Sequence, residues 1–167
     1  MTPQITEHPG MTLAGFSIHT GLAGSANLRD IPAFWQHYSQ HHRAALLAAL
    51  GTQTAPEYGV VCRFDPYTGS FDYLVGMEWP EGHPLPEGAE RYILAPATYA
   101  VFTTPPAATD ADFRAGIVDT WQAIYRDWLP ASAWQAAPRE VFERYDGRCL
   151  PGRPDRQIDI YQPVIPR

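Results

Sequence analysis

The stretch VFERYD, residues 141–146, repeats the stretch VVCRFD, residues 60–65, with the same valine, arginine and aspartate and with tyrosine in place of phenylalanine. Both stretches favour strands, because β-branched and aromatic side chains fit a pleated, half-buried surface. Around each of them the chain predicts the same succession of strand, helix, strand and strand. The sequence therefore predicts a duplicated βαββ unit of the α+β class.

In the first half, strands are expected at residues 11–19, 57–64 and 71–79. The last two form a hairpin around the turn DPYTG, because its proline and glycine supply turn geometry. A helix is expected before them, with Asp30 as its N-cap, Pro32 in its first turn and an end near Leu50. The segment that follows the hairpin, PEGHPLPEGAE, is rich in proline and glycine and is expected to link the two halves.

In the second half, residues 91–102 predict one strand, and residues 139–146 and 158–164 predict two more. Between them lies a helix, with Thr109 and Asp112 as a capping box and Pro130 as its stop. Its apolar residues recur at helical spacing: Phe113, Ile117, Trp121, Ile124 and Trp128.

The whole of residues 1–167 is expected to form a single domain, with pseudo-repeats at about 11–79 and 90–164 that are related by a pseudo-two-fold axis. Antiparallel sheets would bury the two helices on one side. The opposite side would then be free to form a central ligand groove between the halves.

The composition argues against several classes of function. The net charge of −6 disfavours binding to phosphate backbones and to anionic membranes. The start of the chain has no signal-peptide pattern, and no window approaches the roughly 18 apolar residues of a membrane span. Two cysteines without metal or redox spacing fit a reducing cytoplasm. Nucleotide-binding and serine-hydrolase motifs are also missing from the sequence, so no cofactor or metal is expected.

Glu143 is the unusual residue of the repeat, since it places a carboxylate where the first copy has Cys62. Alternate side chains of a strand share a face, so Glu143 and Tyr145 are expected to be neighbours on one surface. If that surface lines an aromatic groove, burial would raise the pKa of a carboxylate there and favour a ligand with positive charge. The alternative is a solvated sheet surface on which Glu143 pairs with Arg63 or Arg91.

The chain resembles the GyrI-like, or AraC-type, effector-binding domains. The stretches that carry the resemblance are IPAFWQHY, YGVVCRFDPYTGSFDYLVGMEW, APATYAVF, WLPASAW, VFERYD and IDIYQPV, which together with their spacing cover nearly the whole chain. The resemblance implies the duplicated architecture, with an aromatic groove that holds an acidic residue at the position of Glu143. It also implies that Tyr145, Tyr161, Tyr73 and Trp121 contribute the walls of a ligand site.

Three functions follow from this resemblance. The first is a stand-alone cytoplasmic module that senses or sequesters small amphipathic or cationic compounds. The second is a hydrolase of strained, cyclopropane-type or otherwise electrophilic compounds, with Glu143 as general acid or base and Tyr145 as its catalytic partner. The third is an interaction protein that acts on gyrase. Direct nucleic-acid binding is not expected, because about ten residues precede the first expected strand, although a regulatory partner protein could supply that role.

Overall fold

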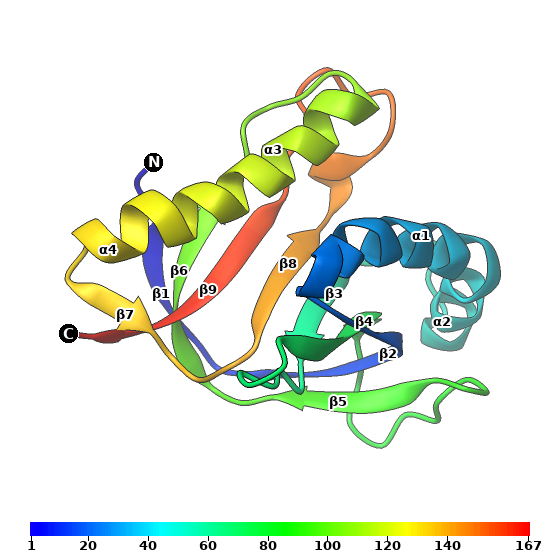
Figure 1. The fold of residues 1–167 in the computed structure, drawn as a ribbon. Coiled ribbons are helices and arrows are strands. Elements are labelled where there is room, and N and C mark those ends of the chain that lie inside the picture. Colours follow the sequence, from blue (N-terminus) through cyan, green and yellow to red (C-terminus); the bar gives the residue numbers. More distant parts are fainter. The chain divides into compact units, whose positions relative to one another are not determined.

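The computed structural model describes residues 1–167, which form two compact units. One unit is Gly10–Leu94, and the other combines Met1–Pro9 with Ala95–Arg167. In each unit, helices pack on one face of antiparallel strands (Figure 1), so the predicted α+β class is confirmed. None of the helices is both long enough and apolar enough to span a lipid bilayer.

The Gly10–Leu94 unit contains four strands in the order β3-β4-β2-β5. Its elements are β2 (Met11–Gly21), α1 (Ala26–His41), α2 (Arg43–Leu50), β3 (Glu57–Cys62), β4 (Ser70–Glu78) and β5 (Glu90–Leu94). The core lies between the helices and one face of β2 and β4, where Phe34, Tyr38 and Leu46 from the helices meet Ala14 and Val75 from the strands. The predicted hairpin is confirmed as β3 and β4.

The first predicted helix differs from the structure at its start. It begins at Ala26 instead of Asp30, because a 3-10 turn over Ala23–Ser25 leads the chain directly into α1. Asp30 is therefore not an N-cap. Its carboxylate accepts hydrogen bonds from the Thr20 hydroxyl and the Arg29 guanidinium, both at 2.9 Å. The end at Leu50 is confirmed, although the extended φ of −121° at His42 divides the predicted helix into α1 and α2.

The proline-rich segment before β5 does not link the two units, contrary to prediction. It connects β4 to β5 inside the Gly10–Leu94 unit and packs against the end of α2. The Trp79 indole donates to the carbonyl of His83 at 3.1 Å, and the His83 ring lies 2.8 Å from the carbonyl oxygen of Ala49. These contacts hold the loop between β4 and β5 against the Gly10–Leu94 unit, although the loop has no strand pairing.

The strand predicted at residues 91–102 is divided in two. β5 ends at Leu94 and pairs with β2, whereas β6 (Ala97–Thr103) belongs to the other unit. Pro96 lies at the division, where it has no N–H to donate and restricts the backbone of Ala95. The second pseudo-repeat was predicted to begin at about residue 90, whereas the Gly10–Leu94 unit of the structure extends to Leu94.

The second unit has strand order β1-β6-β9-β8, with β7 also paired to β9. Its elements are β1 (Gln4–His8), β6, α3 (Asp110–Ala123), a π-helical segment (Ile124–Trp128), α4 (Leu129–Ala131), β7 (Trp134–Ala136), β8 (Val141–Tyr145) and β9 (Asp159–Pro166). The strands β1 and β7 were not predicted. The Thr109 cap of α3 is confirmed, since its hydroxyl oxygen accepts from the backbone N–H of Asp112 at 3.1 Å. α3 packs on β6 and β9 through a core that includes Phe102, Ile124 and Ile160.

Candidate functional site

Glu143 lies in β8 on the face of the sheet that α3 covers. In the antiparallel register it is opposite Ile160, which belongs to the core beneath the helix. Opposite residues of such a pair direct their side chains to the same face. Only 8% of Glu143 is exposed. The prediction of a groove on the face away from the helices is therefore wrong for Glu143, because strand parity turns it toward α3.

Each oxygen of Glu143 accepts a hydrogen bond from a neutral aromatic side chain. The indole N–H of Trp121, in α3, donates to Oε1 at 2.7 Å, and the hydroxyl of Tyr145 donates to Oε2 at 2.9 Å. The second bond confirms that residues 143 and 145 share a face of the strand. These two donors hold the carboxylate in a fixed orientation without adding a positive charge to it.

The alternative of a solvated Glu143 is contradicted by its burial. The two arginines considered as its partners have other contacts in the Gly10–Leu94 unit. Arg63 donates to Asp72 at 2.8 Å and to Glu90 at 2.6 Å, while Arg91 donates to the carbonyl of His83 at 2.8 Å.

Tyr125 extends the aromatic surface around Trp121, and the sequence reasoning missed it. The two rings are stacked, with centroids 6.1 Å apart and planes at 16°, and 49% of Tyr125 is exposed. Tyr125 lies in the π-helical segment that follows α3, and π-helical turns are frequent at functional sites. The signal in the sequence was its i+4 spacing from Trp121, which places both residues on one helix face.

Tyr161 does not join this group. It lies in β9 opposite Phe142, on the other face of the sheet, and its ring stacks on that of Phe142 at 4.3 Å. The rings of Tyr99 and His8 lie edge-on to both of them. Tyr161 therefore contributes to an aromatic cluster across the sheet from Glu143.

Tyr73 belongs to the Gly10–Leu94 unit, where β4 carries it into the core beneath α1. It is 2% exposed, and its hydroxyl oxygen accepts a hydrogen bond from the Trp35 indole at 3.0 Å. The structure thus brings Glu143, Tyr145 and Trp121 together within one unit and places Tyr73 in the other.

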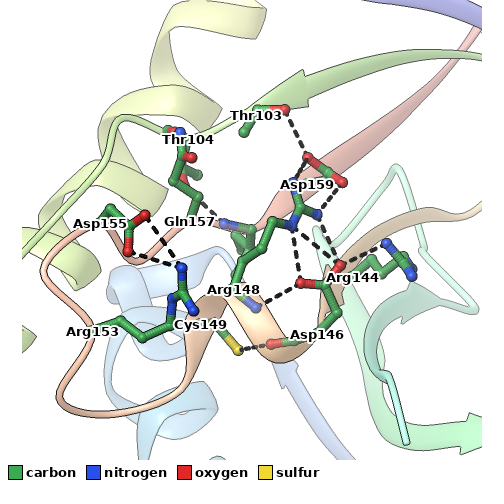
Figure 2. A network of polar contacts seen from close by, with 11 residues as sticks. Thr103, Thr104, Arg144, Asp146, Arg148, Cys149, Arg153, Asp155, Gln157 and Asp159 are labelled. Carbon is green, nitrogen blue, oxygen red and sulfur yellow. Dashed lines mark hydrogen bonds and ion pairs between the residues drawn. The ribbon is translucent and has the colours of Figure 1, made fainter.

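A polar network fixes the chain directly after β8. Figure 2 shows the Arg148 guanidinium between Asp146 and Asp159, with Arg144 on the outer side of Asp146 and Thr103 bonded to Asp159. The hydrogen bonds from Arg148 lower the pKa of Asp146 despite its partial burial. Since Asp146 follows Tyr145 directly, this network holds the end of the strand that carries Glu143.

Comparison with protein families places the chain among effector-binding proteins, as the resemblance implied. More specifically, the chain belongs to the family of integron-associated effector binding proteins, whose sequence model matches residues 4–164.

One curated relative is similar to this chain in sequence, and two solved structures share its fold. The transcriptional regulator BrlR of Pseudomonas aeruginosa PAO1 is 32% identical over 168 residues, which cover 98% of this chain and 56% of BrlR. The chain thus spans little more than half the length of that regulator. The structure of SAV2435 bound to tetraphenylphosphonium has a TM-score of 0.76 and 18% identity, over 99% of this chain and 94% of SAV2435. An integron cassette protein from Vibrio cholerae has a TM-score of 0.71 and 18% identity, over 99% and 97% of the two chains.

Proposed function

We propose that this effector-binding protein binds lipophilic organic cations, and that Glu143 provides the charge that selects them. The observation that carries the proposal is a carboxylate that is only 8% exposed and that the aromatic side chains of Trp121 and Tyr145 contact directly. An apolar cation would complement that charge and the aromatic surface at the same time.

Magnitudes favour charge as the main determinant. Two unit charges 4 Å apart attract by about 4 kcal/mol at an effective dielectric of about 20. A cation over an aromatic face contributes about 0.5–2 kcal/mol. Glu143 would therefore set the requirement for a cation, while Trp121, Tyr145 and the stacked Tyr125 would set a looser requirement for shape.

Two relatives support this function. The structure of SAV2435, which shares the fold, contains tetraphenylphosphonium, a lipophilic cation. BrlR, which shares 32% identity, is a transcriptional regulator. We therefore propose that this chain senses or sequesters such cations.

The test is calorimetric titration of the protein with tetraphenylphosphonium. We expect Glu143→Gln, which removes the charge and retains the shape, to weaken binding at least about tenfold, or about 1.4 kcal/mol. The matched control is Glu78→Gln, because Glu78 is exposed at the end of β4. Equal affinity of the wild type and Glu143→Gln would exclude Glu143 as the charge determinant.

The hydrolase and gyrase-inhibitor functions stay predictions. The hydrogen bonds to Glu143 fit a general acid or base as well as a binding group, so they do not favour catalysis.

A further inference from the structure

A hollow of about 630 Å³ lies wholly within the Gly10–Leu94 unit, and none of its lining residues belongs to the unit that contains Glu143. We propose that this hollow is a second ligand site, which binds a protonated organic amine with a flat apolar body. Its lining includes Phe16, Asp30, Phe34, His37, His42 and Glu90. This site does not depend on the function proposed for Glu143.

The hollow forms where one edge of β2 loses its neighbouring strand. β5 pairs only with Met11–Gly15, so the next residues of β2 have no strand beside them on that edge. α1 borders the space on one side, and the chain around Gly88 borders it on the other. A free strand edge presents backbone N–H and C=O groups, which gives the hollow hydrogen-bonding capacity beyond its side chains.

A flat apolar wall is provided by Phe16 and His42. Their rings are stacked with centroids 3.8 Å apart and planes at 13°. Gly88 has a φ of +77°, and a Cβ atom there would lie 3.5 Å from the Phe16 ring. Glycine therefore leaves the approach to the ring open. Phe34, which is 7% exposed, adds a second aromatic side chain to the lining.

Two carboxylates supply acceptors on either side of the β2 edge: Asp30 lies on the face that carries Phe16, and Glu90 lies on the opposite face. Asp30 accepts hydrogen bonds from Thr20 and Arg29, and Glu90 accepts from Ser17 and Arg63. A carboxylate has about four acceptor positions, so each retains capacity for an N–H donor of a ligand.

The charged side chains that line the hollow favour a cation, because they are the carboxylates of Asp30 and Glu90 and include neither lysine nor arginine. The guanidiniums that pair with them, those of Arg29 and Arg63, do not line the hollow. Burial, together with the neighbouring His37 and His41, lowers the pKa of His42 and so favours its neutral imidazole. His19, at the rim, is bonded to Asp72 at 2.8 Å.

The acceptors also define the kind of cation. Carboxylates and backbone carbonyls bind an ammonium group through its N–H donors, which a quaternary ammonium lacks. The flat wall formed by Phe16 and His42 matches an aromatic ring. The expected ligand class is therefore an arylalkylamine in its protonated form.

The test is a titration of ¹⁵N-labelled full-length protein with 2-phenylethylamine, followed by amide chemical shifts. We expect saturable shifts at residues 16–19 and at His42. We expect Glu90→Gln and, as a second variant, Asp30→Asn to weaken this binding at least about fivefold. Phenethyltrimethylammonium, which has the same ring and charge but no N–H donor, should shift these amides at least about fivefold less at equal concentration.

Three outcomes would overturn the proposal: no shift at these residues up to about 10 mM amine, unchanged affinity in both variants, or equal binding of the quaternary analogue. Binding at the other site would be recognised separately by shifts at Trp121 and Tyr145. Failure at this hollow is thus distinguishable from failure of the function proposed for Glu143.

Discussion

At the scale of single residues, the aspartates that close the two copies of the repeated hexapeptide have the same structural role. The Asp65 carboxylate accepts from the backbone N–H of Tyr67 at 2.8 Å, and the Asp146 carboxylate accepts from that of Arg148 at 2.9 Å. Each aspartate thus stabilises the turn two residues ahead, as Asx turns do. In both copies the aspartate lies between a strand and a turn, directly after β8 in one and three residues after β3 in the other.

The Tyr145 hydroxyl gives a direct prediction about stability. Tyr145→Phe removes one donor from a buried carboxylate, and a hydrogen bond to a charged group contributes about 1.5–3 kcal/mol. We expect the free energy of unfolding, measured by urea denaturation, to fall by that amount. Tyr67→Phe deletes the same hydroxyl from a residue that is 96% exposed and should change it by less than about 0.5 kcal/mol. Equal unfolding midpoints for both variants would contradict the role of the hydrogen bond.

The neighbourhood of Glu143 could be predicted from sequence only in part. Strand periodicity is local, so the shared face of Glu143 and Tyr145 followed from their spacing. The face of the sheet on which these two residues lie could not be predicted, because no local feature indicates which face of β8 is covered by α3. Tyr161 was misgrouped for the same reason: its face depends on the register between β8 and β9, which two distant segments determine jointly.

At the scale of elements, two glycines show how the same residue can be required in a strand and dispensable in a helix. Gly76 of β4 lies opposite Gly15 of β2, and a Cβ atom on Gly76 would come within 2.8 Å of the Gly15 Cα. Gly116 lies inside α3, where an added Cβ would be 3.7 Å from its nearest neighbour, the Pro105 Cδ.

The two alanine substitutions should therefore change stability in opposite directions. Gly76→Ala forces two backbones apart and should lower the free energy of unfolding by about 1–3 kcal/mol. Gly116→Ala improves helix propensity without a clash and should raise it by about 0.5–1 kcal/mol. Urea denaturation of both variants beside the wild type measures the difference. Destabilisation by Gly116→Ala would mean that helix propensity does not dominate at this position.

Among the elements, two that have local signals were predicted correctly. The β3–β4 hairpin has a proline and a glycine in its turn, and α3 has its Thr109 cap, so both were recognised from adjacent residues. The strand β1 has no such signal, since it is stabilised by pairing with β6, which lies about 90 residues later in the chain. The break between β5 and β6 was not predicted, because the residues on both sides of Pro96 favour strands. Pro96 itself was the local signal of the boundary.

At the scale of the whole molecule, one strand departs from simple chain order, because Met1–Pro9 belongs to the unit that otherwise begins at Ala95. β1 precedes the Gly10–Leu94 unit directly but pairs with β6 in the other unit. β5 lies close to β6 in sequence but pairs with β2. A change in β1 or β5 should therefore alter the local stability of the unit with which that strand pairs. It should not alter that of the segment next to it in the chain.

Hydrogen exchange resolved by peptide can test this assignment. Replacing Gln4–His8 with a Gly/Ser segment of equal length removes the ladder that protects one edge of β6. Amide exchange in Ala97–Thr103 should accelerate about tenfold or more, because local opening loses its cross-strand hydrogen bonds. Exchange in the adjacent β2 should be unchanged. The reciprocal replacement of Glu90–Leu94 should accelerate exchange in Met11–Gly15 and leave β6 unchanged. If the first replacement accelerated exchange in β2 as much as in β6, the two units would open together, and pairing would not determine which of them depends on β1.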